Sequence, residues 1–125
     1  MEINDISYQI RGAAFNVYNN LGPGLLESVY QYALAHELSK MGLNVHTEVP
    51  VPVVYNDKKL ELGFRLDVLV EGRVLVEIKS VEEIHKVHHK QVLTYLKLTG
   101  CKLGLLINFN TDDLKRSIFR KVNNL

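Results

Sequence analysis

The chain is 125 residues long with 46% hydrophobic and 23% charged residues, a balance typical of a small globular protein, so we expect residues 1–125 to form a single domain. Fifteen Lys and Arg against fourteen Asp and Glu leave a net charge of +1, which excludes a strongly basic or acidic protein; the lone Cys101 excludes an internal disulfide. Because the N-terminus lacks a signal-peptide pattern and no apolar run could span a bilayer, we expect a cytoplasmic protein without a membrane partner.

Two helices are predicted at the start of the chain. Apolar residues recur at helical spacing over roughly residues 5–20, and "GPG" at positions 22–24 then breaks the pattern. A second helical pattern runs from about Leu25 to Met41 and ends at Gly42. These segments predict an N-terminal helical layer.

Strands are predicted next. Three segments rich in β-branched residues follow, "VHTEVPVPVVY", "LELGFRLDVLV" and "RVLVEIK", separated by "NDKK" and "EG". They predict a three-stranded antiparallel meander. Pro50 and Pro52 cannot donate to a ladder, so the first segment is confined to an edge position or a bulged strand.

The last part of the chain predicts a helix, a strand and a helix. The first helix runs from about Glu83 to Thr99, and "KLGLLINF" is typical of a buried strand, which completes a right-handed strand–helix–strand crossover. The tail "TDDLKRSIFRKV" has a cap at Asn110 or Thr111, acids in its first turn and bases in its last, so it predicts a closing helix. The expected order is ααβββαβα, a mixed α/β fold.

The last two strands of the meander alternate between an apolar and a charged face. The even positions are expected to form one continuous buried face, made of Leu62, Phe64, Leu66, Val68, Val70, Val74, Val76 and Ile78. The odd positions carry Arg65, Asp67, Glu77 and Lys79. Since paired residues share a face, we predict a three-residue loop, Val70 to Gly72 or an odd-length equivalent, with Gly72 left-handed. This register brings Asp67 near Glu77 and Lys79.

This group of charges has two interpretations. Two carboxylates held close together repel, and a hard divalent cation turns that repulsion into binding. A neighbouring lysine can then orient a water or stabilise developing negative charge. The alternative is a solvated face on which Asp67, Glu77 and Lys79 form a salt-bridge network.

Two motifs resemble those of a known family. Asp67, nine intervening residues and Glu77-Ile78-Lys79 resemble the D…ExK signature of the PD-(D/E)XK nuclease superfamily, and "GLLESVY" at residues 24–30 resembles the GxxExxY motif of a family within it. The resemblance covers about residues 10–119 and implies a three-layer, restriction-endonuclease-like core with a mixed central sheet flanked by helices. One departure is Leu66, which stands where many members have proline.

The resemblance also implies the roles of individual residues. Asp67 and Glu77 would bind Mg²⁺ or Mn²⁺, with the carbonyl oxygen of Ile78 as a third ligand. Lys79 would be catalytic, positioning the attacking water and stabilising the transition state. Glu27 corresponds to an acid that related nucleases bring from an N-terminal helix to the metal or its water shell; its alternative role is compensation of the helix dipole.

A second set of residues is expected to contact nucleic acid. Gln91 and Tyr95 share a helical face and resemble the QxxxY element of RecB-like nucleases, in which the Gln assists catalysis and the Tyr contacts nucleic acid. An ordinary helix face would carry the same pair. We expect Tyr30, the last residue of the GxxExxY motif, and the basic residues Lys86 and Lys90 to contact nucleic acid as well.

Three histidines give a rival interpretation of the same helix. His85, His88 and His89 have spacings at which they could meet on one side and hold zinc. Neither a cysteine nor an HExxH motif lies nearby, so a basic patch that touches phosphates is favoured, with a solvated helix face as its alternative.

These features predict a Mg²⁺-dependent or Mn²⁺-dependent nuclease that hydrolyses phosphodiester bonds in nucleic acid, with DNA as the expected substrate. The alternative is a nuclease fold with weak or no activity that serves as a nucleic-acid-binding or protein-interaction module. Because so small a core offers little surface to grip a duplex, we expect a homodimer or a larger protein partner.

Overall fold

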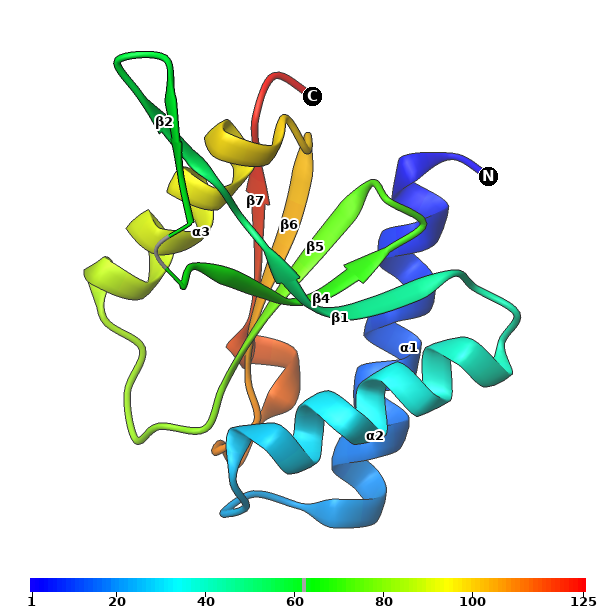
Figure 1. Cartoon of the computed structure of the whole chain (residues 1–125). Coiled ribbons are helices and arrows are strands. Elements are labelled where there is room, and N and C mark those ends of the chain that lie inside the picture. The colour runs from blue at the N-terminus through cyan, green and yellow to red at the C-terminus, as the bar shows by residue number, and fades with distance from the viewer. Residues whose placement is uncertain (62) are drawn as a thin grey trace.

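A computed structural model of the protein describes residues 1–61 and 63–125; Leu62, which was predicted on the buried face, lies outside the described residues. Two helices, α1 (Ile3–Leu21) and α2 (Glu27–Lys40), open the chain and pack against each other (Figure 1). Both predicted helices are confirmed to within two residues at each end. No helix in the described part of the chain is long and apolar enough to cross a membrane.

A five-stranded mixed sheet follows, with the strand order β1-β4-β5-β6-β7. Its strands are β1 (Val45–Pro50), β4 (Arg65–Val70), β5 (Val74–Lys79), β6 (Leu103–Asn108) and β7 (Ile118–Val122). Strands β5 and β6 are parallel and are joined by α3 (Lys86–Thr99), whereas the other neighbours are antiparallel. The meander of β1, β4 and β5 and the strand–helix–strand unit are confirmed.

Helices cover both faces of this sheet. On one face α1 and α2 pack against the alternate residues Val74, Val76 and Ile78 of β5, and on the other α3 packs against Leu75 and its neighbour Leu106. Each face therefore has its own hydrophobic core, because period-two alternation sends successive side chains of a strand to opposite sides. The expected three-layer fold, a mixed sheet flanked by helices, is confirmed.

The hairpin between β4 and β5 keeps the predicted parity. Val70 pairs with Val74 and Val68 with Val76, so the loop has an odd length and even positions face even positions. The loop is Glu71 to Arg73, one residue later than Val70 to Gly72, and Gly72 adopts the predicted left-handed φ of 63°.

The even face is shorter than predicted. It consists of Val68, Val70, Val74, Val76 and Ile78. Phe64 precedes β4 and is 44% exposed, and Leu66 packs with the core beneath α3. The change of side coincides with Glu48 on β1, which has a φ of 51° and interrupts the pairing of β1 with β4. The prediction of one continuous buried face was therefore wrong at Phe64 and Leu66.

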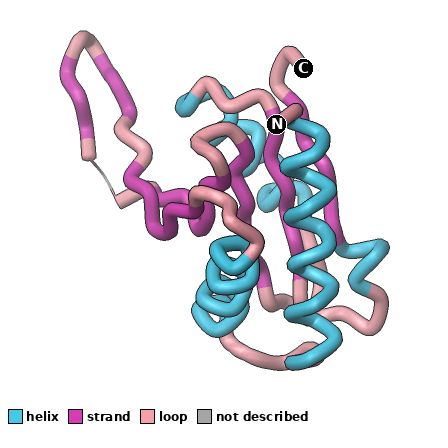
Figure 2. The backbone as a smooth tube through the Cα atoms, turned by 90° about the vertical axis from the view of Figure 1, so that its right-hand side faces the viewer, coloured by secondary structure: helices cyan, strands magenta, loops and turns pink. Residues whose placement is uncertain are grey.

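The segment "VHTEVPVPVVY" is not one strand. β1 ends at Pro50, and a separate two-stranded sheet, β2 (Val53–Tyr55) and β3 (Lys58–Leu60), follows it. Proline cannot donate to a ladder, and residues 51–52 accordingly lie between the two sheets. This β2–β3 ribbon stands away from the body of the molecule in two views at right angles (Figures 1 and 2).

The predicted closing helix is wrong. The tail forms a single 3₁₀ turn, η1 (Leu114–Ser117), and then the edge strand β7, which pairs antiparallel with β6. The charges of the tail suit a helix dipole, but pairing with the open edge of β6 and burial of Ile118 favour a strand. Tertiary context overrides the local preference here.

Candidate active site

The β4–β5 ladder ends where the two predicted acids face each other. The last residue pair there is Val68 with Val76, and the register puts Asp67 opposite Glu77. Glu77 Oε1 accepts a hydrogen bond from the Asp67 N–H at 3.2 Å, and Asp67 Oδ2 accepts one from the Ile78 N–H at 2.7 Å. These bonds let the strands separate without leaving a buried N–H unsatisfied. The predicted convergence of Asp67 and Glu77 is confirmed.

Glu77 is a buried acid, with only 3% of its surface exposed. Burial, followed by repulsion from Asp67, raises the pKa of Glu77 from 4.5 to about 8. The N–H of Asp67 and the positive charge of Lys79 act in the opposite direction. Near neutral pH the carboxyl pair therefore retains a proton unless a cation joins it.

The pKa of Asp67 is also shifted by burial and by neighbouring charges. Burial raises the pKa of Asp67, while the Ile78 N–H and Lys79 act to lower it. Glu27 and Glu48 add negative charge to the site and act to raise that pKa further. Sequence reasoning missed Glu48; its place opposite Asp67 follows from the β1–β4 register, in which Thr47 pairs with Val68 and Val49 with Leu66.

Lys79 is the last residue of β5 and lies two residues after Glu77 on this strand. Its backbone pairs with Asn108 of β6, and its carbonyl accepts a hydrogen bond from the Phe109 N–H at 2.9 Å. The Lys79 charge acts on the pKa of both acids. Among the residues that the structure describes, Lys79 forms no ion pair, so the alternative of a salt-bridge network is wrong.

Glu27 begins α2 beside the end of β5. Its Oε2 accepts a hydrogen bond from the Ser80 N–H at 3.2 Å, and the Ser80 hydroxyl donates to the Leu25 carbonyl at 2.6 Å. The structure thus brings Glu27 next to Lys79. Glu27 does not join Asp67 and Glu77 as a third ligating side chain, since the described residues contain no group of three His, Cys, Asp or Glu that could hold a metal.

Tyr30 supports the loop that precedes Glu27. The Tyr30 hydroxyl donates to the Gly22 carbonyl at 2.6 Å and accepts from the Leu25 N–H at 3.1 Å, while its ring stacks on Phe109 with centroids 4.5 Å apart. The side chain is completely buried. The prediction that Tyr30 contacts nucleic acid was therefore wrong, because the tyrosine of this motif is part of the core.

Gln91 and Tyr95 lie on helix α3, which covers the face of the sheet opposite α1 and α2. Gln91 Nε2 donates to the Tyr95 hydroxyl at 3.1 Å, and the Tyr95 ring meets Phe64 edge-on with centroids 6.5 Å apart. Burial, and then the charge of Glu77, raises the pKa of Tyr95. Tyr95 is 5% exposed, so its burial contradicts the predicted contact with nucleic acid and gives it a packing role instead. Lys86 and Lys90 are exposed on the same helix, and their contact with phosphates stays a prediction.

The three histidines do not form a zinc site. His88 Nδ1 accepts a hydrogen bond from the His85 N–H at 3.0 Å, whereas the His89 ring turns to Phe119, with centroids 4.9 Å apart. No three metal-ligating side chains come together in the part of the chain that the structure describes. The zinc interpretation was therefore wrong.

Comparison with known proteins agrees with this geometry. A family model described as the PD-(D/E)XK nuclease superfamily matches residues 4–121. The chain belongs to the PD-(D/E)XK nuclease superfamily. Searches of curated proteins and of solved structures found no match.

His88 lies near enough to Lys79 and Glu27 of this PD-(D/E)XK site to feel their charges, whereas sequence reasoning gave it only a zinc or phosphate-contact role. Partial desolvation, followed by the charge of Lys79, lowers the pKa of His88, and Glu27 acts in the opposite direction. Because Nδ1 accepts a hydrogen bond, the neutral ring carries its proton on Nε2. The signal was the spacing of residues 88, 91 and 95, which share one face of a helix.

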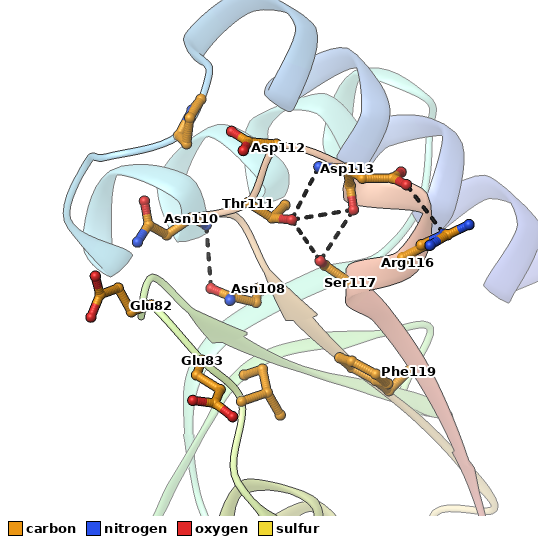
Figure 3. A pocket seen from close by; sticks show the side chains of 12 residues that line it. Glu82, Glu83, Asn108, Asn110, Thr111, Asp112, Asp113, Arg116, Ser117 and Phe119 are labelled. Atoms are coloured by element: carbon orange, nitrogen blue, oxygen red, sulfur yellow. Dashed lines mark hydrogen bonds and ion pairs between the residues drawn. The ribbon is translucent and has the colours of Figure 1, made fainter.

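A hollow of about 590 Å³ lies beside the loop that follows β5 (Figure 3). Its rim carries the acids Glu82, Glu83, Asp112 and Asp113, and Asp113 pairs with Arg116 at 3.5 Å. Asn108, in its wall, accepts from the Val81 N–H and donates to the Val81 carbonyl, which ties the loop to β6. An acidic rim repels phosphates, so this hollow does not suit the nucleic-acid substrate of a PD-(D/E)XK nuclease.

Proposed function

We propose that this PD-(D/E)XK protein, as a member of the GxxExxY family within the superfamily, is a metal-dependent nuclease that hydrolyses phosphodiester bonds in DNA. The observation that carries the proposal is the pair of half-buried Asp67 and buried Glu77, held at 2.7 and 3.2 Å by hydrogen bonds across the fork of β4 and β5. A lysine stands at the end of the same strand. Such an arrangement of acids stabilises a fold poorly by itself and suits the binding of a cation.

The donor set fits Mg²⁺ or Mn²⁺. Both are hard cations that prefer oxygen ligands, and Mg²⁺ is usually held by one or two carboxylates together with waters and substrate phosphates, without a complete protein cage. Asp67 and Glu77 each use one carboxylate oxygen to accept a hydrogen bond from a backbone N–H. We propose their remaining oxygens and the carbonyl oxygen of Ile78 as the ligands. Glu27 would act through the water shell, since it is not part of a three-residue ligand group.

The bound metal would supply Lewis-acid polarisation of the scissile phosphate and a lower pKa for an attacking water. Lys79 would hold that water in line and stabilise the negative charge that grows on the phosphoryl oxygens. Gln91, fixed by its hydrogen bond to Tyr95, would donate to a non-bridging phosphate oxygen. Glu27, fixed on the Ser80 N–H, would orient water next to Lys79.

The test compares cleavage by three proteins: wild type, Lys79→Ala and Asp67→Asn. Each is incubated with single-stranded, double-stranded and branched DNA and with RNA, in Mg²⁺, in Mn²⁺ and in EDTA. Glu82→Gln, which removes an exposed acid on the rim of the hollow, serves as the matched control. We expect metal-dependent cleavage of DNA by wild type and by the control, and a loss of about 100-fold or more in both site variants.

A different result would favour the alternative function. Binding of nucleic acid without cleavage by any form, in any metal, would indicate a binding module that keeps the nuclease fold. Calorimetric titration with Mg²⁺ separates the two further, because binding of metal that Asp67→Asn abolishes supports the site even if the substrate is wrong.

A further inference from the structure

The β2–β3 ribbon is the one element of the described structure that stands away from the layered body (Figures 1 and 2). Its turn, Asn56-Asp57, has φ angles of 50° and 62°, as a two-residue type I′ hairpin requires. At its base the Val51 N–H donates to the Phe64 carbonyl at 2.8 Å, and Val51 is buried in the core beneath α3. The ribbon therefore projects from a fixed base.

The side chains of the ribbon are those of a contact surface. Val54 is 66% exposed and Tyr55 is 67% exposed, although both residue types favour burial in a sheet. An isolated two-stranded ribbon is at best marginally stable in water. A partner that covers these apolar side chains would stabilise the ribbon, which indicates that its working state is the bound one.

The ribbon carries a net positive charge, with Lys58 and Lys59 against the single acid Asp57 in its turn. Lys58 lies directly opposite Tyr55 in the ladder and Lys59 opposite Val54, so each face carries one exposed apolar side chain and one lysine. Neither lysine forms an ion pair with any residue that the structure describes. An ammonium group without an ion-pair partner beside an exposed aromatic ring, as in Lys58 and Tyr55, suits a polyanion with flat apolar groups, which is the chemistry of a nucleic-acid strand with unpaired bases.

The ribbon also lies on the side of the proposed cleavage site. Phe64, at the base of the ribbon, packs edge-on against Tyr95 of α3, and Arg65 begins the strand that carries Asp67. A groove of about 440 Å³ at this base is lined by Lys59, Phe64 and Arg65 among others, and its two cations outnumber its one acid, Glu61. A strand that leaves the carboxylate pair along this groove would meet the ribbon next.

We propose that the β2–β3 ribbon binds single-stranded nucleic acid beyond the cleaved bond. The strand would pass Lys59, which lines the groove and contacts one phosphate, and cross the edge of the ribbon to the opposite face, where Tyr55 stacks on an unpaired base and Lys58 contacts a second phosphate. The inference rests on the proposed function, because it assumes that a nucleic-acid strand occupies the cleft. It names an unpaired strand as the substrate class, so the protein would act on single-stranded or branched DNA in preference to continuous duplex.

The experiment measures binding separately from cleavage. Fluorescence anisotropy with a labelled single-stranded oligonucleotide, and with the same sequence as a duplex, is recorded in EDTA across a range of salt concentrations. The variants are Tyr55→Ser and the double variant Lys58→Gln/Lys59→Gln. The double variant Lys40→Gln/Lys102→Gln is the control, since it removes the same charge far from the acids: Lys40 ends α2 one helix length from Glu27, and Lys102 precedes β6 at the end opposite Asn108.

We expect Tyr55→Ser to weaken single-strand binding about tenfold and to leave duplex binding unchanged. The ribbon lysine variant should lower the slope of log K against log salt by about 1.4, the contribution of two phosphate contacts to a single strand. The control variant should change neither quantity. Circular dichroism should show that all variants remain folded, because the ribbon lies outside both cores.

The proposal would be overturned if both ribbon variants bound single-stranded DNA with the affinity and salt slope of the wild type. It would also be overturned if the control variant lost as much affinity as the ribbon variants, or if the wild type did not bind single-stranded DNA. An equal loss on duplex would overturn the assignment to unpaired strands. If the lysine variant only aggregates while its monomer binds normally, the lysines guard the ribbon edge and the proposal fails. Binding that depends on the ribbon, without cleavage, would contradict the proposed nuclease activity but not the proposed role of the ribbon. Cleavage together with binding that does not depend on the ribbon would contradict only the proposed role of the ribbon.

Discussion

Replacing Glu77 by glutamine should make the metal-free protein more stable at pH 8 and remove much of its loss of stability with rising pH. Glutamine keeps an oxygen that can accept the Asp67 N–H but carries no charge at any pH. In the wild type, burial and the neighbouring Asp67 raise the pKa of Glu77 from 4.5 to about 8. The substitution therefore removes a charge that the folded protein accommodates poorly.

The sign of the effect follows from proton binding. Between pH 4.5 and 8 the folded chain holds a proton on Glu77 that the unfolded chain has released. The folded state then binds more protons, so the free energy of unfolding falls as pH rises through this window, and the stabilisation is complete only below pH 4.5. A pKa displaced this far corresponds to about 5 kcal/mol. Because Asp67 shares the proton, we expect about 2–4 kcal/mol in practice.

The assay is urea unfolding in EDTA at intervals from pH 5 to pH 8, followed by circular dichroism. Glu82→Gln is the control for removing an exposed carboxylate. Adding Mg²⁺ at pH 8 should raise the stability of the wild type by about 2.7 kcal/mol at a hundred times its Kd, and should leave Glu77→Gln unchanged. A wild type whose stability stays level or rises from pH 5 to pH 8 in EDTA, in parallel with Glu77→Gln, would refute the reasoning.

Three further substitutions test how the site is held. Tyr30→Phe leaves the Gly22 carbonyl and the Leu25 N–H without their buried partner, so urea unfolding should show a loss of about 1–3 kcal/mol; an unchanged midpoint would contradict the loop contacts. His88→Ala removes the acceptor for the His85 N–H, and we expect a loss of about 1 kcal/mol in thermal unfolding, which His88→Asn should partly restore. Gly104→Ala would place a Cβ 2.9 Å from Leu75 Cδ1 and 3.1 Å from Val92 Cγ1, so overpacking should cost about 1–3 kcal/mol; stability equal to wild type would show that α3 can move away from β6.

The acidic pair could be predicted because two independent local rules agree on it. Alternation from Asp67 to Lys79 fixes which side chains share a face, and the odd loop around Gly72 fixes which residues stand opposite each other. Together they place Asp67 across from Glu77 without knowledge of the rest of the fold. The stopping of the ladder at Val68 and Val76 could not be predicted, because it depends on carboxylates that replace backbone acceptors.

Other features depended on partners that are distant in the sequence. The charges of the tail are compatible with a helix, and only the open edge of β6 decides in favour of β7. Tyr30 matched a motif, but a motif fixes the position of a residue and not its role, and stacking on Phe109 assigns it to the core. Glu48 and His88 reach the site through the β1–β4 register and through the face of α3, which local sequence leaves open.

The energetics of the acid pair favour the proposed enzyme over a binding module. A module that only holds a polyanion has no need of two adjacent carboxylates, one buried and one half-buried, which repel phosphates and destabilise the folded chain near neutral pH. Glu27 and Glu48 add to this negative charge, as their effect on the pKa of Asp67 shows. Their joint presence with Lys79 is explained if a divalent cation compensates the acids, since the same cation then attracts the phosphate that the carboxylates alone would exclude.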